Sequence, residues 1–394
     1  MNTRLLAPAG LVAATLLLAS CGGGGSAGDG GGGGIGGTGG TMRISMTDAP
    51  ACGYDEVNVT IERIRVHQSG TAVDGDSGRH DIVVSPARRI DLLTLTNGAL
   101  EELGETALPA GRYTQMRLVL ADNGSLTPPP NSVVPTGGAE VALTTPSAQQ
   151  SGLKLNTAID VPEGKVADVV LDFDACKSVV KRGNSGQYNL KPVIQVIPLL
   201  ADAGLRITGY VDPSIATGAS VSVQSGGVPV KATVPDLTGR FVLYPVPAGT
   251  YDLVMTANGR VNAVVTGVPV VAATPTALND AAHALLPPAS AGRAVVGTLT
   301  PPTASLRALQ TLTAGPSFEA AWAPVDAVSG AFALGLPIGA PVRATYVAPP
   351  AALAFTTDTA VAGRYRLDAA SGGVHKTVDI DTSAAVPPVT LTFP

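Results

Sequence analysis

Short segments in which apolar and polar residues alternate, separated by Gly and Pro, recur through most of this chain and constrain its fold more than any other feature. The segment Val57-Asn58-Val59-Thr60-Ile61 is one example, and a period of two is typical of a strand with one buried face. The 47 glycines and 32 prolines among 394 residues interrupt helices and supply the backbone angles of tight turns. The sequence therefore predicts an all-β protein made of tandem β-sandwich domains.

The strands expected between residues 42 and 200 follow this alternation. They cover residues 43–47, 57–67, 81–84, 113–120, 166–173 and 188–197. In the second of them the apolar phase changes between Ile61 and Ile64, which predicts a β-bulge. Residues 99–103 are expected to form a short helical turn, and residues 122–150, rich in Pro, Asn, Thr and Gly, a long loop or a loose hairpin.

The first 41 residues differ from the rest of the chain. Arg4 precedes a largely apolar stretch over residues 5–18, which is too short to span a bilayer as a helix of about 20 residues. Leu18-Ala19-Ser20-Cys21 follows and resembles the lipobox of bacterial lipoproteins, in which an aliphatic and two small residues precede a Cys. The resemblance implies that residues 1–20 are a signal peptide and that acylated Cys21 holds the protein to a membrane.

The residues after Cys21 predict a flexible tether. Residues 22–40 hold 14 glycines in 19 positions and have too few side chains to offset the entropy of ordering them, so residues 21–41 are interpreted as the lipidated Cys plus a Gly-rich tether. Gly22 rather than Asp after the Cys is similar to the sorting pattern that favours the outer membrane over the inner one. We therefore expect a cell-envelope protein, lipid-anchored in the outer membrane, with its folded part periplasmic or exposed on the surface.

The charge pattern excludes one class of partner. The formal net charge is −5 at pH 7, and the sequence has no run rich in Lys and Arg. Nucleic-acid binding depends on clustered cations that neutralise phosphates. We therefore expect no nucleic-acid partner.

Several blocks between residues 42 and 200 occur in an order that resembles the domain-of-unknown-function 4382 family. They are residues 46–50 (Met-Thr-Asp-Ala-Pro), 57–66, 90–93 (Ile-Asp-Leu-Leu), 108–118 and 188–194. The resemblance implies a β-domain of a bacterial lipoprotein over residues 42–200. It implies no catalytic residue, because no established activity accompanies this family.

Two further units follow. In residues 204–289, a strand at Gly239-Arg240-Phe241 is followed by the turn Pro247-Ala248-Gly249 and a strand from Tyr251, which resembles the carboxypeptidase-regulatory-like, transthyretin-type sandwich. The resemblance implies an immunoglobulin-like or prealbumin-like β-sandwich with Tyr251 over its edge. Residues 292–394 repeat this order in degraded form, with Gly330-Ala331-Phe332 and Leu336-Pro337-Ile338-Gly339 in the matching places, which predicts a second such sandwich.

Besides Cys21, the chain has two cysteines, Cys52 and Cys176, both within the first unit. Two thiols in one exported domain usually pair. The sequence therefore predicts a disulfide between Cys52 and Cys176.

Four carboxylates are weak candidates for a metal site. Asp172 and Asp174 share one face of a strand, and Asp48 and Asp55 lie near Cys52. The predicted disulfide could bring these carboxylates together to hold Ca²⁺; the alternative is that they face solvent or cap turns. Because the four histidines are scattered, no zinc site and no other cofactor is expected.

Two aromatic residues are weak candidates for ligand contact. Trp322 is the single Trp, and Tyr244 precedes a Pro. A carbohydrate-binding surface usually has several aromatic side chains, so packing in a core is the alternative for both.

The leading hypothesis is a non-enzymatic, membrane-anchored envelope lipoprotein. It would present its β-sandwich domains to bind an envelope protein or a carbohydrate, or would serve as an envelope spacer. The alternative is an envelope hydrolase whose site lies in residues 122–150 and at the edge formed by Asp172 and Asp174.

Overall fold

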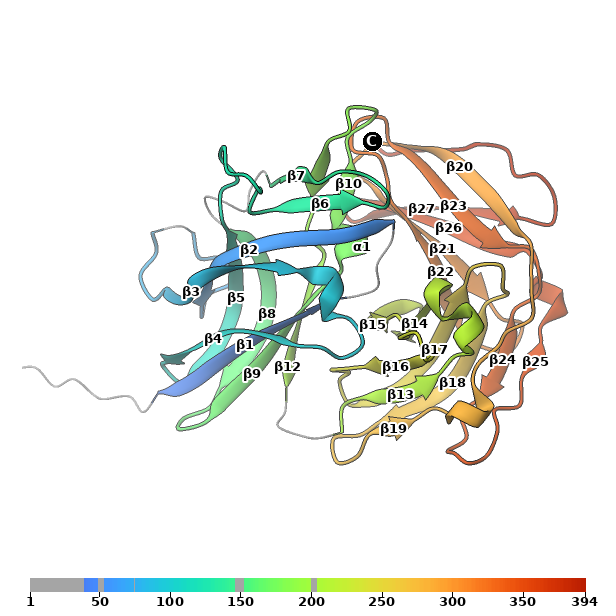
Figure 1. Cartoon of the computed structure of the whole chain (residues 1–394), viewed down its shortest axis with the longest axis horizontal. Coiled ribbons are helices and arrows are strands. Elements are labelled where there is room, and N and C mark those ends of the chain that lie inside the picture. The colour runs from blue at the N-terminus through green and yellow to red at the C-terminus, as the bar shows by residue number, and fades with distance from the viewer. Residues whose placement is uncertain (1–38, 49–52, 74, 146–151, 200–203) are drawn as a thin grey trace, which may run out of the picture. The chain divides into compact units, whose positions relative to one another are not determined.

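The computed structural model describes residues 39–48, 53–73, 75–145, 152–199 and 204–394 (Figure 1). Thr38–Pro394 form one compact unit. The described residues are mostly strands, with one short α-helix, α1 (Ala175–Ser178), and a few 3-10 turns. The prediction of an all-β protein with tandem β-sandwich domains is confirmed.

The first domain, residues 39–199, packs two sheets against each other. The smaller sheet has the order β12 (Ile194–Leu199), β9 (Val166–Phe173), β1 (Gly40–Asp48) and β4 (Glu101–Leu108). The larger sheet has the order β10 (Val179–Lys181), β11 (Tyr188–Leu190), β7 (Val141–Thr144), β6 (Ser132–Pro135), β2 (Tyr54–His67), β5 (Gly111–Leu120) and β8 (Leu153–Val161), with β3 (His80–Asp91) paired to β2. Ile44 and Phe173 from the smaller sheet and Ile61 and Met116 from the larger one are fully buried between them.

Two details of β2 and its surroundings agree with the sequence. The register of β2 against both β3 and β5 shifts between Ile61 and Arg63, which confirms the predicted bulge. Within residues 122–150, β6 and β7 pair as an antiparallel hairpin, so the hairpin form of that prediction is confirmed.

Two local predictions were wrong. Residues 99–103 are not helical: Glu101 and Glu102 pair with Met46 and Ser45 of β1, and this pairing outweighs a weak local helix preference. The single strand expected over residues 188–197 is two strands in different sheets, because Pro192 between them has no N–H for a ladder bond and the chain crosses from β11 to β12 there.

The second and third domains have the same seven-strand order. In the second, β16 (Arg240–Leu243), β13 (Ile207–Tyr210) and β19 (Thr276–Ala277) face β15 (Val228–Thr233), β14 (Ala219–Ser225), β17 (Gly249–Ala257) and β18 (Ala263–Val270). In the third, β23 (Ala331–Pro337), β20 (Gly292–Thr300) and β28 (Val389–Thr392) face β22 (Ser317–Ala323), β21 (Ser305–Thr311), β26 (Arg364–Ser371) and β27 (Val374–Asp381). If the strands are numbered 1 to 7 along each domain, with β24 and β25 left out, both domains have one sheet of order 4-1-7 and one of order 3-2-5-6. The repeat seen in the sequence is therefore a repeat of topology.

One insertion joins the two sandwiches. Between β23 and β26 the chain forms β24 (Val342–Thr345) and β25 (Thr356–Thr357). β24 pairs in parallel with β18, so a segment between strands of the third domain extends a sheet of the second. In Figure 1, β24 and β25 continue the sheet of β17 and β18.

Candidate functional site

Residues of all three domains line one cavity of about 520 Å³, called the junction cavity below. Asp172 and Asp174 of the first domain, Ser220 and Thr256 of the second and Trp322 of the third are among its walls. A cavity of this size with convergent polar groups is typical of a small-ligand site.

The second domain contributes the polar face of one sheet to the cavity. Ser220 on β14 lies opposite Thr256 on β17 in antiparallel register, so both hydroxyls are on the same side of the sheet. The next pair in register, Val221 and Met255, is fully buried in the sandwich core. Alternation along two strands therefore places hydroxyls in the cavity while it places apolar side chains in the core.

A buried ion pair connects the first domain with the second. Lys231 Nζ on β15 donates to Asp172 Oδ1 on β9 at 2.5 Å, and their side chains are 1% and 7% exposed. Lys231 Nζ also lies 3.4 Å from the backbone oxygen of Asp48. Burial raises the pKa of Asp172, and the neighbouring Lys231 ammonium opposes that rise.

Asp48 is buried behind this pair. Its Oδ1 accepts a hydrogen bond from the Ala175 N–H at 2.9 Å, and its Oδ2 has no hydrogen-bond partner among the described residues. Burial raises the pKa of Asp48 well above its ordinary value, and the carboxylates of Asp174 and Asp172 raise it further. Folding therefore shifts the protonation equilibrium of Asp48 toward its neutral form.

A second ionic chain runs from the first domain into the third. Asp174 caps α1 by accepting from the Lys177 N–H at 3.0 Å, and Lys177 Nζ donates to Glu319 Oε1 at 3.0 Å. Arg307 lies 4.0 Å from Glu319 and 2.8 Å from Asp368. Burial raises the pKa of both Asp174 and Glu319, and Lys177 opposes the rise in each case.

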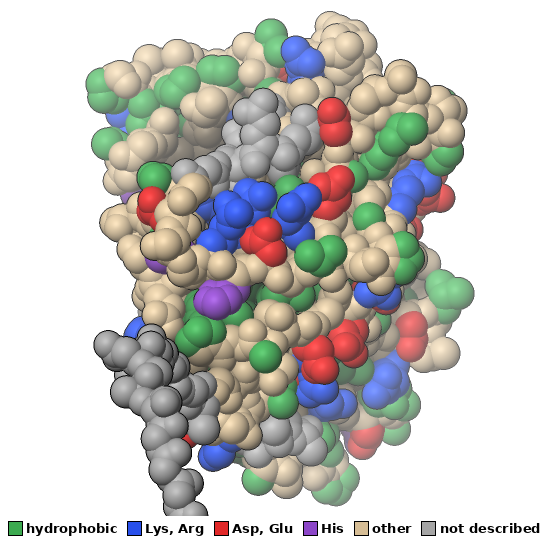
Figure 2. All heavy atoms as spheres, turned by 90° about the vertical axis from the view of Figure 1, so that its left-hand side faces the viewer, with side chains coloured by type: hydrophobic (Ala, Val, Ile, Leu, Met, Phe, Trp, Pro, Cys, Tyr) green, Lys and Arg blue, Asp and Glu red, His purple; other side chains and the backbone are tan. Residues whose placement is uncertain are grey.

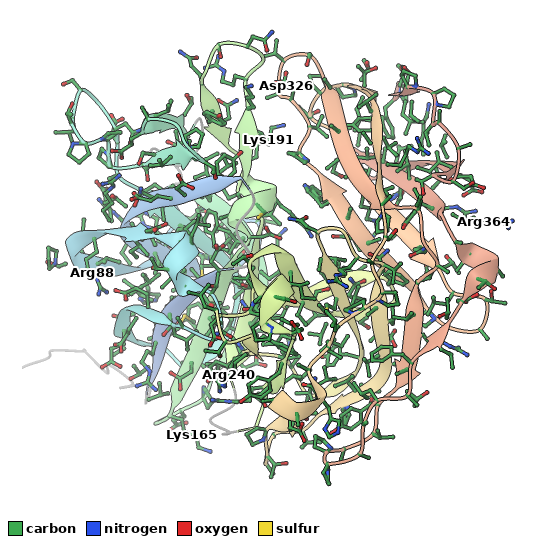
Figure 3. All side chains as sticks on the ribbon, turned by 45° about the vertical axis from the view of Figure 1, so that its right-hand side comes forward. Arg88, Lys165, Lys191, Arg240, Asp326 and Arg364 are labelled. Atoms are coloured by element: carbon green, nitrogen blue, oxygen red, sulfur yellow. The ribbon has the colours of Figure 1, made fainter. Side chains whose placement is uncertain are left out.

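Hydrogen bonds to backbone groups complete the junction. Gln224 of the second domain exchanges two hydrogen bonds with the backbone of Glu319, at 2.9 and 2.8 Å. Asp326 of the third domain accepts from the Gly183 N–H of the first at 2.6 Å, and Figure 3 shows Asp326 at this meeting of the two domains. Each domain is thus bonded to the other two.

Trp322 and Tyr54 are the aromatic residues of the cavity wall. Trp322 on β22 is half-buried, and Lys177 Nζ lies 4.9 Å from its ring centroid, within the range of a cation–π contact. Burial raises the pKa of Tyr54 to about 12, so its hydroxyl stays protonated at neutral pH.

The predicted candidates are brought together only in part. Asp172, Asp174 and Trp322 line the junction cavity, and Asp48 lies against its ionic pair. Asp55 lies elsewhere, exposed at the start of β2, where its Oδ2 accepts from the Gly137 N–H at 3.2 Å. Tyr244 also lies outside the cavity wall and packs against Arg206, whose Cζ is 4.4 Å from the ring centroid.

The carboxylates are neutralised by side chains of the protein. Lys231 and Lys177 occupy the positions beside Asp172 and Asp174 that the calcium hypothesis assigns to a cation. Among the described residues no group of three or more His, Cys, Asp and Glu is arranged to hold a metal ion. The residues present therefore fit an ion-paired junction better than a Ca²⁺ site.

The remaining predicted residues are only partly visible. Cys176 is disulfide-bonded, whereas Cys21 and Cys52 lie outside the described residues, so the pairing of Cys52 with Cys176 remains a prediction. Residues 122–145, the described part of the predicted hydrolase loop, contribute no side chain to the junction cavity. None of the helices in the described ranges has the length and apolar character needed to cross a membrane.

Sequence reasoning missed Lys231, Lys177 and Glu319. Lys231 follows Val228-Pro229-Val230 in a strand. A single charged residue in an otherwise apolar strand was the available signal, because a buried charge needs an oppositely charged partner. The partner's identity was not readable, because Asp172 is 59 residues away along the chain.

The outer face of the first domain is a weaker candidate. Figure 2 shows Lys and Arg side chains on this side of the molecule interspersed with acidic ones. Asp81 lies within 3.9 Å of Arg63 and within 3.6 Å of both Arg65 and Arg79. Glu62 also lies 3.7 Å from Arg63, so two carboxylates offset part of the positive charge of these three arginines.

The comparisons with known proteins bear mainly on the first domain. Residues 39–192 match the family described as Domain of unknown function (DUF4382), which supports the resemblance found in the sequence of that domain. No curated protein matches the chain.

Solved structures resemble the chain only distantly. Two interface mutants of a type II cohesin–X-dockerin complex from Acetivibrio cellulolyticus are 25% and 24% identical, with TM-scores of 0.20 and 0.19; each match covers 22% of this chain and 59% of that chain. The Bacillus anthracis TIE protein is 11% identical over 90% of this chain and 51% of its own, with a TM-score of 0.17. The chain thus spans little more than half the length of the solved chains that it matches.

Proposed function

We propose that this protein is a non-enzymatic, lipid-anchored protein of the cell envelope whose three β-sandwich domains bind a ligand in the junction cavity. The observation that carries the binding role is the cavity itself, which is lined by all three domains and holds hydroxyl, amide and aromatic side chains. A spacer would need only the domain contacts and not a cavity of about 520 Å³ among them. The ligand would be a carbohydrate or a segment of an envelope protein.

The arrangement of the carboxylates supports binding over hydrolysis. A general acid or nucleophile must reach a substrate with a free oxygen, whereas Asp172 is held by Lys231 at 2.5 Å and Asp174 caps α1. Both carboxylates therefore have structural partners in the resting protein.

The anchoring part of the proposal rests on the lipobox-like segment Leu18-Ala19-Ser20-Cys21 and the Gly-rich tether after it. Thioether-linked and amide-linked acyl chains together hold a protein firmly to a bilayer. The tether would then let the three domains meet ligands near an outer-membrane surface.

Blocking the cavity tests the binding role. Ser220→Tyr places a bulky side chain on the cavity face of β14, and Thr377→Tyr makes the matching change on exposed β27 of the third domain. We expect Ser220→Tyr, but not Thr377→Tyr, to abolish binding to polysaccharide or protein fractions of the envelope, measured by calorimetry on the Thr38–Pro394 unit. Equal binding by both variants would contradict a site in this cavity.

Two further measurements address the anchor and the alternative. Cys21→Ser should leave the protein unlabelled by a palmitate analogue and release it from membranes.

A broad hydrolase screen should show no turnover of any substrate. Activity that disappears in Asp172→Asn or Asp174→Asn would contradict the binding role and favour the hydrolase alternative.

A further inference from the structure

The charged groups that line the junction cavity are already paired with one another. Lys231 lies beside Asp172, and Lys177 lies beside both Asp174 and Glu319. A charged ligand could form an ion pair here only after it broke an existing one, and the Lys231–Asp172 pair is buried. The cavity is consequently matched to a ligand without net charge.

Three uncharged polar side chains of the cavity have unused bonding capacity. Ser220, Thr256 and Asn258 line the cavity and have no side-chain hydrogen bond to another described residue. The other amides and hydroxyls of the wall, such as those of Gln224 and Asn262, are already hydrogen-bonded. Hydroxyl and amide groups both donate and accept, so these three residues form a compact set of two-way hydrogen-bonding groups. An apolar ligand would remove water from them without replacement, at a cost in affinity.

Trp322 provides an apolar surface beside these groups. Its ring is half-buried, and its neighbours on β22 along the cavity wall are the small residues Ala320 and Ala321. Lys177 approaches one part of the ring at 4.9 Å, and the small neighbours leave room for a flat ligand against the remainder. An aromatic ring adds contact area at little entropic cost.

From this combination we infer that the ligand of the junction cavity is a neutral saccharide, with its hydroxyls on Ser220, Thr256 and Asn258 and a C–H face against Trp322. A neutral sugar carries vicinal hydroxyls that both donate and accept, and its ring faces are apolar. The inference rests on the proposed binding function and specifies its ligand class.

The test is calorimetric titration of the Thr38–Pro394 unit with trisaccharides of similar size. The neutral probes are maltotriose, cellotriose and mannotriose; the charged probes are trigalacturonic acid and triglucosamine; the peptide probe is an uncharged Ser/Gly tetrapeptide. We expect at least one neutral trisaccharide to bind at least tenfold more tightly than either charged one. Ser220→Ala and Thr256→Val should each weaken binding about 3–10-fold, Trp322→Ala should abolish it and Trp322→Phe should retain part of it.

Matched controls separate loss of binding from loss of folding. Ser371→Ala and Thr377→Val make the same chemical changes on the third domain away from the cavity and should bind like the parent. Unfolding midpoints of all variants are measured in parallel. Partial binding by Trp322→Phe would show that Trp322→Ala loses binding because the aromatic ring is missing.

The outcomes distinguish the ligand class from the binding function. Tighter binding of a charged trisaccharide, or no effect of Ser220→Ala and Thr256→Val, would overturn the saccharide assignment. Binding of the peptide or of an envelope protein fraction that Ser220→Tyr blocks, with no response to any trisaccharide, would also overturn it but keep the proposed function. Silence toward all probes and all envelope fractions would overturn both.

Discussion

The second and third domains share one topology but make the same key hydrogen bond at very different sequence separations. In the second, Tyr251 Oη on β17 donates to the carbonyl of Pro247 at 2.9 Å, four residues away. In the third, Tyr365 Oη donates to the carbonyl of Pro337, also at 2.9 Å, across 28 residues. Tyr365 lies on β26, the topological equivalent of β17, and the β24–β25 insertion separates it from its turn.

The first domain makes the same local bond, from Tyr113 Oη to the carbonyl of Pro109 at 3.0 Å. The Pro-Ala-Gly-x-Tyr spacing therefore identifies the turn in the first two domains, whereas the insertion hides it in the third. A spacing motif is lost when a loop grows, although the contact it encodes survives.

Close packing around a glycine is the other feature that both sandwiches retain. Gly209 lies opposite Phe241, and Gly297 lies opposite Phe332, in the first strand of each domain. A methyl group at Gly209 would lie 2.5 Å from the Phe241 ring, and one at Gly297 would lie 1.9 Å from the Val389 carbonyl oxygen. Only a glycine leaves room for the core Phe in either domain.

The two domains are attached to the first domain by ion pairs of unequal burial. Lys231–Asp172 holds the second domain and is 1% and 7% exposed, whereas Lys177–Glu319 holds the third and is 17% and 9% exposed. Glu319 also has Arg307 nearby. Removal of one partner is most costly where the remaining charge has neither water nor another cation.

The largest expected effect comes from breaking the buried pair. Lys231→Met leaves Asp172 buried without its cation and should lower the free energy of unfolding by about 3–5 kcal/mol. Lys177→Met should cost about 1–2 kcal/mol, because Arg307 still faces Glu319 and water reaches the site. Urea unfolding of the Thr38–Pro394 unit measures both.

The double variant Lys231→Met/Asp172→Leu is the control for this prediction. Removing both charges should recover most of the loss, because no unpaired charge remains buried. If Lys231→Met and Lys177→Met lower the free energy of unfolding equally, the difference in burial between the two ion pairs does not determine their contributions to stability.

Alanine at the paired glycines should have the next largest effect. Gly297→Ala should destabilise the protein by about 3 kcal/mol, because the added methyl group meets backbone that cannot move aside. Gly209→Ala should cost about 2 kcal/mol, since its nearest neighbours are the Phe241 ring and the Asn279 side chain. Thermal unfolding checks the order, and Gly335→Ala, whose added methyl group meets no atom within 4 Å, is the matched control.

The sequence predicted the strands and repeats well because alternation and turn residues act locally. The bulge in β2 was visible as a phase change between Ile61 and Ile64. The junction could not be predicted in the same way: Lys231 and Asp172, or Lys177 and Glu319, meet only once three separate domains dock. Trp322 was recognised as a candidate by its rarity, but its place in a cavity wall depends on that docking.

A moderate, pH-dependent effect is expected at Asp48, beside the attachment of the second domain. Burial raises the pKa of Asp48 in the folded state, so its contribution to stability is fully present below the unfolded pKa of about 3.9 and is lost as pH rises through the folded value. Asp48→Asn keeps an oxygen for the Ala175 N–H and cannot ionise. It should therefore match the parent near pH 4 and be more stable by about 1–2 kcal/mol at pH 7.

Chemical denaturation at pH 4, 5.5 and 7 measures this difference. Asp55→Asn, at an exposed position of β2 in the same domain, is the control and should change stability little at any of these values. A gain for Asp48→Asn that does not grow with pH would contradict a neutral Asp48 in the folded state.

The smallest effect concerns the shared tyrosine bond itself and tests whether sequence separation or burial sets its energy. Tyr365 is 3% exposed and its hydroxyl also lies 3.5 Å from Asn262 Nδ2. Tyr365→Phe should cost about 1 kcal/mol, because a buried hydrogen bond is lost that water cannot replace, although Thr382 still donates to the Pro337 carbonyl and Asn262 to Gln310. Tyr251 is half-buried and its bond to Pro247 is exposed, so Tyr251→Phe should cost only a few tenths of a kcal/mol, because water replaces the hydroxyl. Differential scanning calorimetry of the two variants decides the matter: a larger loss at Tyr251 would mean that the local turn contributes more to the sandwich than the bond closed across the insertion.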